Sequence, residues 1–125
     1  MKNPVNWFEI PVNDMDRAKN FYETILGIEI TLTDIGNALM GWFPFEPNSG
    51  GATGTLIKAE SYVPSYDGTM VYFSVEEIND IIPKIRSTGC KIINEKFSIG
   101  EHGFCAHFED SEGNRVALHQ NANPS

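Results

Sequence analysis

Three side chains of this sequence could together bind a polar ligand or transfer protons: the Glu9 carboxylate, the Tyr72 phenol and the His119 imidazole. Glu9 is the one charged residue in the apolar stretch WFEIPV, residues 7–12. A charge buried there without a partner costs several kcal/mol, a large part of the stability of a small domain. Glu9 could therefore contact a ligand, or act as a general base with His119 or Tyr72 as the acid or oxyanion donor.

Two other interpretations of these residues stay open. A buried Glu–His–Tyr cluster can be a hydrogen-bonded part of the core that contributes only stability. Glu9 and His119 could also hold a metal ion, although two ligands make a poor site.

The hydrophobic pattern indicates which elements position Glu9. Residues 5–12 have the composition of a strand that ends at a turn of Asn13 and Asp14. Asp14 then caps a helix, which Gly27 ends. The apolar positions of this helix recur at helical spacing, at Met15, Ala18, Tyr22 and Ile25. Strands are expected to follow at about residues 28–34, 38–45 and 54–58.

The second half repeats this order. We expect a strand at 70–75, a helix marked by Ile78, Ile81 and Ile85 that ends at Gly89, and strands at 91–97, 103–109 and 114–120. Pro83 is tolerable near the first turn of that helix but would kink a helix that began as early as Glu77. A shift of 63 residues lays Trp7, Glu9 and Val12 on Met70, Tyr72 and Val75. The sequence therefore predicts an α+β fold of two βαβββ modules.

Alternation along the strands assigns the faces of each sheet. One helix covers one face, and Phe8, Ile10 and Val12 fit the covered face of the first module. Glu9 then lies on the opposite face. By the same reasoning, the side chains on the uncovered face of the two sheets include Trp7, Met70, Tyr72, Ala117 and His119.

Composition narrows the class of protein. The 125 residues are 41% hydrophobic, which is ordinary for one globular domain. The formal charge of −8 and the scattered Lys and Arg argue against a nucleic-acid partner. No apolar run approaches a membrane span, and the first residues lack a secretory signal pattern. Two cysteines make no disulfide framework, so we expect a cytoplasmic protein with reduced thiols.

The chain resembles the vicinal oxygen chelate superfamily, which includes glyoxalase I, bleomycin and fosfomycin resistance proteins and extradiol dioxygenases. The resemblance covers nearly the whole chain and rests on IPVNDMDRAKNFYETILGIE in the first module and FEDSEGNRVALHQ in the second. It implies one glyoxalase-like domain, with modules at about 5–58 and 69–120 and a linker at 59–68. The modules would form a cupped mixed sheet around a small-molecule cavity, and the protein would be a homodimer.

The resemblance also implies a metal site, from which this sequence departs. Metal-binding members place His or Glu on four strands, and the matching positions here are Trp7, Thr55, Met70 and Ala117. Divalent ions of this kind prefer imidazole, carboxylate or water oxygen as ligands. We therefore predict no metal at the usual site, and no other cofactor.

The remaining polar groups lie two residues further along the same faces. Glu9, Tyr72 and His119 would form a second ring inside the cup, with Ile57 as its apolar member. An apolar ligand pocket could be lined by Trp7, Trp42, Phe43, Phe45, Ile57 and Met70, although core packing explains the aromatic residues among them equally well.

Two further motifs carry less weight. His102, Cys105 and His107 are metal-binding residue types, but the first is expected in a turn and the other two on a strand. No C-x-x-C pairing supports a site there. The stretch NSGGATG, residues 48–54, is followed by no helix and is interpreted as a turn rather than a dinucleotide loop.

These observations leave several functions open. The chain could be a glyoxalase-like lyase or isomerase with Glu9 as base, although enediolate chemistry relies on Lewis-acid stabilisation of negative charge. It could instead sequester a small molecule without a metal, as the resemblance to bleomycin resistance proteins implies. A metal-dependent lyase with the shifted ligands Glu9 and His119, and a regulatory subunit with a vestigial cavity, are the remaining alternatives.

Overall fold

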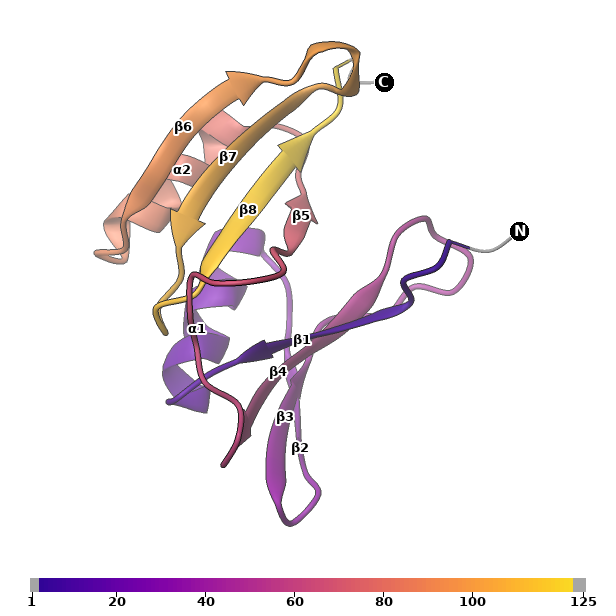
Figure 1. The fold of residues 1–125 in the computed structure, drawn as a ribbon, viewed down its shortest axis with the longest axis vertical. Helices are drawn as coiled ribbons and strands as arrows, with labels where there is room; N and C mark the ends of the chain where they lie inside the picture. The colour runs from indigo at the N-terminus through magenta and orange to yellow at the C-terminus, as the bar shows by residue number, and fades with distance from the viewer. Residues whose placement is uncertain (1–2, 123–125) are drawn as a thin grey trace. The chain divides into compact units, whose positions relative to one another are not determined.

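The computed structural model describes residues 3–122, which form two compact units that divide between Pro64 and Ser65. Each unit contains a four-stranded mixed sheet and one α-helix, in the order βαβββ (Figure 1). This arrangement confirms the predicted α+β fold of two tandem modules.

The first unit consists of β1 (Trp7–Pro11), α1 (Met15–Leu26), β2 (Thr31–Asp34), β3 (Ala38–Trp42) and β4 (Thr53–Ala59). Its strand order is β1-β4-β3-β2, with β1 parallel to β4 and the other neighbours antiparallel. The parallel pair at one edge is the reason that a helix must connect β1 to the rest of the sheet.

Helix α1 begins and ends where the sequence predicts. The Asp14 side chain accepts a hydrogen bond from the Arg17 amide at 3.0 Å, and Gly27 adopts the left-handed conformation with φ of 65°. The helix buries all four predicted apolar positions and Phe21 in addition. The amphipathic pattern therefore located this helix correctly.

The sheet of the first unit has one covered and one open face. Ile10, Val12 and Leu56 are 3% exposed or less and lie on the face that α1 covers. Glu9 is exposed on the other face. The stretch WFEIPV is thus a half-buried strand rather than a buried one, since a single helix covers only one side of it.

The second unit consists of β5 (Tyr72–Ser74), α2 (Ile78–Ser87), β6 (Ile92–Ser98), a 3₁₀ turn (Gly100–His102), β7 (Phe104–Glu109) and β8 (Arg115–Gln120). Its strand order, β5-β8-β7-β6, repeats the order of the first unit. The covered face buries Phe73, Phe108 and Leu118. Figure 1 shows α2 along one face of this sheet.

Helix α2 differs from the prediction in two details. Its buried positions are Ile78, Ile82 and Ile85, whereas Ile81 is only half-buried. Pro83 lies in the interior of the helix, which continues through it from the cap at Glu77. The apolar face that packs on the sheet offsets the backbone hydrogen bond that Pro83 cannot make.

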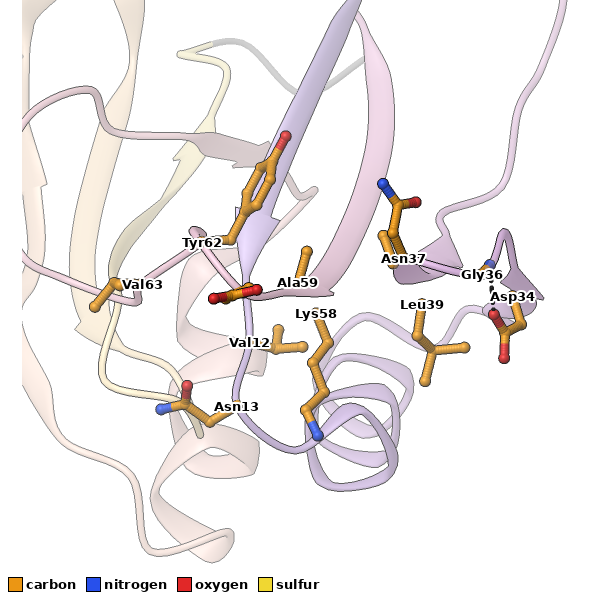
Figure 2. Close-up of a pocket in the computed structure, with 12 residues that line it drawn as sticks. Val12, Asn13, Asp34, Gly36, Asn37, Leu39, Lys58, Ala59, Tyr62 and Val63 are labelled. Atoms are coloured by element: carbon orange, nitrogen blue, oxygen red, sulfur yellow. Dashed lines mark hydrogen bonds between the residues drawn. The ribbon is translucent and has the colours of Figure 1, made fainter.

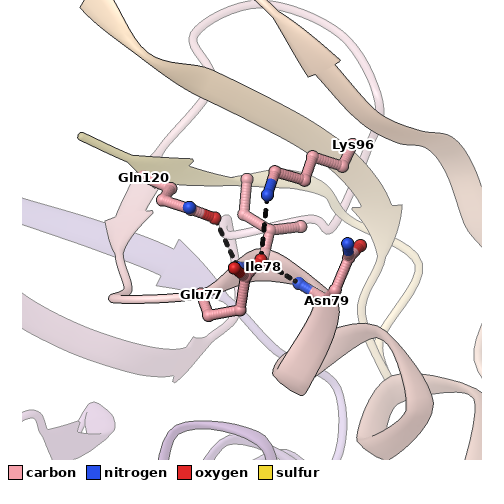
Figure 3. A network of polar contacts seen from close by, with 5 residues as sticks. All are labelled: Glu77, Ile78, Asn79, Lys96 and Gln120. Atoms are coloured by element: carbon pink, nitrogen blue, oxygen red, sulfur yellow. Dashed lines mark hydrogen bonds and ion pairs between the residues drawn. The ribbon is translucent and has the colours of Figure 1, made fainter. Parts of the chain in front are cut away.

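A polar network fixes the start of α2 (Figure 3). The Glu77 carboxylate accepts hydrogen bonds from the Asn79 amide at 3.0 Å and from Lys96 Nζ at 2.9 Å. The side-chain oxygen of the buried Gln120 accepts a hydrogen bond from the Ile78 backbone amide at 2.8 Å. Lys96 and the Asn79 amide together lower the pKa of Glu77. The network ties the helix to β6 and β8.

The motif FEDSEGNR forms the turn between β7 and β8. The buried Asp110 carboxylate accepts three hydrogen bonds. They come from the backbone amides of Glu112 at 2.8 Å and Asn114 at 2.9 Å, and from the Asn114 side-chain amide at 3.0 Å. Gly113 has φ of 93°, which favours glycine. This part of the motif therefore serves the fold.

The strands differ by a few residues from the predicted ranges, because their ends lack partners in the ladders. The largest differences are at β2, which begins at Thr31 instead of residue 28, and at β3, which ends at Trp42 instead of residue 45. Neither α1 nor α2 in residues 3–122 is long and apolar enough to cross a membrane.

Candidate functional site

Glu9 lies on the edge strand β1, at one end of a row of side chains on the open face of the first unit. The register pairs Glu9 with Thr55 of β4, and Thr55 with Trp42 of β3. The next row pairs Pro11 with Ile57 and Ile57 with Met40. Paired residues point to the same side of a sheet, so Glu9, Ile57 and Met40 share the open face.

The Glu9 carboxylate has a partner that lies outside the sheet. The Tyr62 hydroxyl, which follows β4 by three residues, is hydrogen-bonded to it. This hydrogen bond and the negative charge of Glu9 raise the pKa of Tyr62 above its usual value of 10.0. Tyr62 therefore stays protonated near neutral pH, where a phenol donates to a carboxylate.

A cavity of about 360 Å³ opens beside this pair. Glu9 and Tyr62 line it, and Ile57 and Met40 give it apolar walls. The remaining lining residues are Ile35, Asn37, Ala38, Ala59, Glu60 and Ser61. Its volume is in the range of small-molecule sites, which combine apolar walls with a few placed polar groups.

A second cavity, of about 490 Å³, lies at the same end of the sheet (Figure 2). It shares five lining residues with the first, among them Asn37, Glu60 and Tyr62. On its other side it is lined by Val12, Asp34 and Lys58. In Figure 2 the Tyr62 hydroxyl points away from Lys58. The two cavities thus meet at Tyr62 and Glu60.

The charged groups of the two cavities are mainly acidic. Glu9 and Glu60 line the smaller cavity, and Asp34 and Lys58 are added in the larger one. A carboxylate at an apolar wall favours a ligand that carries a cation, and the Tyr62 ring offers a face for the same group. Glu9 and Tyr62 also have the chemistry of a base and a hydrogen-bond donor.

The predicted aromatic residues of the first unit are divided between three places. The Trp7 and Trp42 rings pack edge to face on the open sheet face, with centroids 4.6 Å apart. Phe43 is buried on the covered side, where its ring contacts Tyr22. Phe45 follows β3 and is 70% exposed. None of these four residues lines either of the two cavities described here.

The predicted residues of the second unit lie on the open face of its own sheet. Tyr72 pairs with Ala117, and His119 lies between Ser74 and Cys105. His119 Nε2 is 2.7 Å from the His102 carbonyl oxygen, so Nε2–H donates and Nδ1 is the nitrogen left to accept. Met70, two residues before β5, is half-buried.

The ring of Glu9, Ile57, Tyr72 and His119 involves both units and stays a prediction. Glu9 and Ile57 are brought together at the smaller cavity. Tyr72 and His119 share one face of the other sheet. The roles of Tyr72 and His119 toward Glu9 are therefore hypotheses.

The residues at the usual metal positions do not fit a metal ion. In the first unit these positions hold an indole, Trp7, and a hydroxyl, Thr55, whose buried oxygen has no hydrogen-bond partner in residues 3–122. In the second unit they hold a thioether and a methyl group, Met70 and Ala117. One hydroxyl oxygen is the sole hard donor of the four.

The other candidate metal residues are distributed as the sequence predicts. His102 is in the 3₁₀ turn, while Cys105 and His107 are on β7. Burial raises the pKa of the Cys105 thiol, which makes it a poor thiolate ligand. Within the described part of the chain, no three His, Cys, Asp or Glu side chains gather as a metal site requires.

Sequence reasoning missed the residues that complete the Glu9 site. Tyr62, Glu60 and Asn37 all lie outside the strands, in segments without periodicity. Met40 could have been found, because alternation along β3 places it on the face of Trp42. For Tyr62 the sequence contains no comparable signal.

A family model described as the Glyoxalase/Bleomycin resistance protein/Dioxygenase superfamily matches residues 5–118. A search of curated proteins gives no match.

Solved structures match over nearly the whole chain. A glyoxalase/bleomycin resistance protein/dioxygenase domain from a Frankia species has a TM-score of 0.75 at 16% identity, covering 97% of this chain and 99% of its own. An antibiotic binding protein from a Streptomyces species has a TM-score of 0.70 at 20% identity, covering 98% and 97%. These TM-scores show a shared fold, which is all that similarity at such low identity shows.

A glyoxalase I mutant from Zea mays has a TM-score of 0.72 at 20% identity. The match covers 94% of this chain but only 45% of the maize chain. This chain therefore spans less than half the length of that enzyme.

Proposed function

This chain belongs to the Glyoxalase/Bleomycin resistance protein/Dioxygenase superfamily, and we propose that it binds a small organic cation in the cavity beside Glu9. The observation that carries the proposal is the Glu9–Tyr62 pair at the wall of a cavity of about 360 Å³. The carboxylate would attract the cation, and the apolar walls would hold the rest of the molecule.

Three features of the site support this choice. Glu60 adds a second carboxylate, while Ile57 and Met40 supply apolar contact. The Tyr62 hydroxyl orients one oxygen of Glu9 and leaves the other lone pairs for a ligand. The described residues therefore supply every group that this mode of binding requires.

Sequestration of a small molecule is the form of this function that we favour. The usual metal positions hold Trp7, Thr55, Met70 and Ala117, and this donor set gives no support to a reaction that depends on a Lewis acid at that place. A structural relative from Streptomyces is described as an antibiotic binding protein. At 20% identity that relative motivates the hypothesis without deciding it.

Proton transfer is the second candidate function. Glu9 borders the cavity and is exposed, so it could take a proton from a bound carbon acid while Tyr62 donates a hydrogen bond to the developing oxyanion. We propose this as an activity that a binding protein of this fold could carry. It predicts exchange of a ligand C–H proton with deuterated solvent, and loss of that exchange in Glu9→Gln.

A thermal-shift screen tests the binding proposal. Cationic, neutral and anionic aromatic compounds are compared on the wild type, on Glu9→Gln and on Glu29→Gln, which removes an exposed carboxylate outside both cavities. A ligand at about 100 times its Kd adds about 2.7 kcal/mol to the free energy of unfolding. We expect cationic hits that Glu9→Gln abolishes and Glu29→Gln retains. Hits that bind both variants equally would refute a role for Glu9.

The predicted homodimer stays a proposal. Light scattering on the purified protein gives the mass directly, with 27.8 kDa expected for two chains of 13.9 kDa. A mass of one chain at micromolar concentration would contradict it.

A further inference from the structure

Two unpartnered nitrogen atoms lie on the open face of the second unit. His107 Nε2 and Arg115 Nε are buried, and neither has a hydrogen-bond partner in residues 3–122. His107 is opposite Ala117 and Arg115 is opposite Glu109 in the β7–β8 ladder. The two side chains are therefore diagonal neighbours on one face, a separation that long side chains span.

Both atoms are hydrogen-bond donors. The nitrogen of Arg115 carries a proton at all pH values relevant to a protein and cannot accept. The Asn94 side-chain nitrogen is 2.8 Å from His107 Nδ1. Because an amide nitrogen only donates, Nδ1 must accept, and the proton of the neutral ring then lies on Nε2. Burial, and next the charge of Arg115, lower the pKa of His107 and favour that neutral form.

Aromatic rings surround these donors. The rings of Tyr72 and Phe97 pack edge to face on the His107 imidazole, with centroid separations of 6.1 and 5.4 Å. Tyr72 is 48% exposed and Phe97 is 38% exposed. Exposed side chains change rotamer rapidly, so these two rings can move on the His107 imidazole that they contact. They would also present faces for a planar ligand.

Charge selects the kind of ligand. The Arg115 guanidinium lies 6.0 Å from the centre of the Tyr66 ring. The Tyr66 hydroxyl donates to Glu109, the carboxylate opposite Arg115. Arg115 is half-buried, but its Nε–H is buried without an acceptor. An unmet buried donor is costly, and an incoming acceptor would remove that cost.

We propose that the open face of the second unit binds a small aromatic carboxylate, with Arg115 and His107 donating to the carboxylate and Tyr72 and Phe97 contacting the ring. All the residues that carry this proposal lie in the second unit. No bond is made or broken in this binding.

Benzoate, benzamide and acetate are the probes that test the proposal. The ring nitrogens of the three histidines are followed by ¹H–¹⁵N NMR in the wild type at pH 7, with His102 of the exposed 3₁₀ turn as the internal reference. We expect benzoate to shift His107 Nε2 saturably, and benzamide and acetate to bind at least about tenfold more weakly, since each lacks either the charge or the ring. Equal binding of benzoate and benzamide, or no shift at His107, would overturn the proposal.

Two variants locate the charge that is responsible. Arg115→Gln is expected to weaken benzoate binding by about tenfold or more. Arg86→Gln removes an exposed arginine that pairs with Glu95 on the same unit. This variant is expected to bind benzoate as tightly as the wild type. Equal loss in the two variants would contradict the site. If Arg115→Gln unfolds, the comparison of the three probes on the wild type decides alone.

Discussion

The Tyr62 hydroxyl is hydrogen-bonded to the Glu9 carboxylate, which joins the segment after β4 to the centre of β1. This bond and the adjacent negative charge raise the pKa of Tyr62. The protonated phenol is therefore the form that the fold favours. Its stabilising contribution is present below the usual tyrosine pKa and is lost as the pH rises through the raised pKa of Tyr62.

Glu9→Gln should lower the pKa of Tyr62 toward 10.0, because it removes the charge that opposes ionisation. NMR titration of the tyrosine ring carbons at alkaline pH measures this directly. Glu29→Gln is the control and should leave the pKa of Tyr62 unchanged. An unchanged value in Glu9→Gln would mean that the pair does not form in solution.

Glu23→Gln should destabilise the protein by about 1 kcal/mol at pH 7. The Glu23 carboxylate accepts the Ile30 amide at 2.8 Å and pairs with Lys19 at 3.1 Å, and these two contacts lower the pKa of Glu23. Urea unfolding at several pH values measures the difference between the two proteins.

The same contacts fix the pH dependence of that difference. A lowered pKa gives a contribution that is present above the usual glutamate pKa of 4.5 and is lost as the pH falls through the folded-state pKa. The gap between wild type and Glu23→Gln should therefore close in acid. A gap that is the same at pH 3 and pH 7 would contradict this explanation.

Gly54→Ala should destabilise the first unit by about 1–3 kcal/mol or more. A Cβ atom at Gly54 would lie 2.1 Å from the Phe8 carbonyl oxygen and 2.7 Å from the Phe8 ring, so β1 and β4 would have to separate. Gly50→Ala is the matched control, because a Cβ there meets nothing within 4 Å. Thermal unfolding of the two variants compares them; equal melting temperatures would exclude the close approach.

Gln120→Leu should cost about 1–3 kcal/mol, since it leaves the buried amide of Ile78 without its acceptor. Denaturant unfolding measures the loss, and the exposed neighbour variant Asn121→Leu should stay close to the wild type. A Gln120→Leu protein as stable as the wild type would show that the network of Figure 3 contributes little.

The fold could be predicted because its signals are local. The caps at Asp14 and Gly27, the amphipathic helix between them and the alternation around Glu9 each follow from neighbouring residues. The repeat at 63 residues then supplied the second unit. The structure differs from the prediction at positions such as Pro83, which lies inside α2. There the packing of the helix on the sheet overrides the low helix propensity of the residue.

The site could be predicted only in part. Glu9 and Ile57 were found because strand alternation locates them, and they border one cavity. Tyr62 was missed because it reaches Glu9 from a segment with no regular pattern. The unpartnered nitrogens of His107 and Arg115 were invisible for a related reason, since an unmet hydrogen bond is a property of packing rather than of residue type.

Cation binding beside Glu9 is tested most directly by a ¹H–¹⁵N NMR titration of the wild type with benzyltrimethylammonium, an aromatic cation without other functional groups. We expect saturable shifts at the backbone amides of Glu9, Met40, Ile57 and Tyr62, and their loss in Glu9→Gln. Shifts confined to other residues, or shifts that Glu9→Gln leaves unchanged, would contradict the proposal that this cavity binds organic cations.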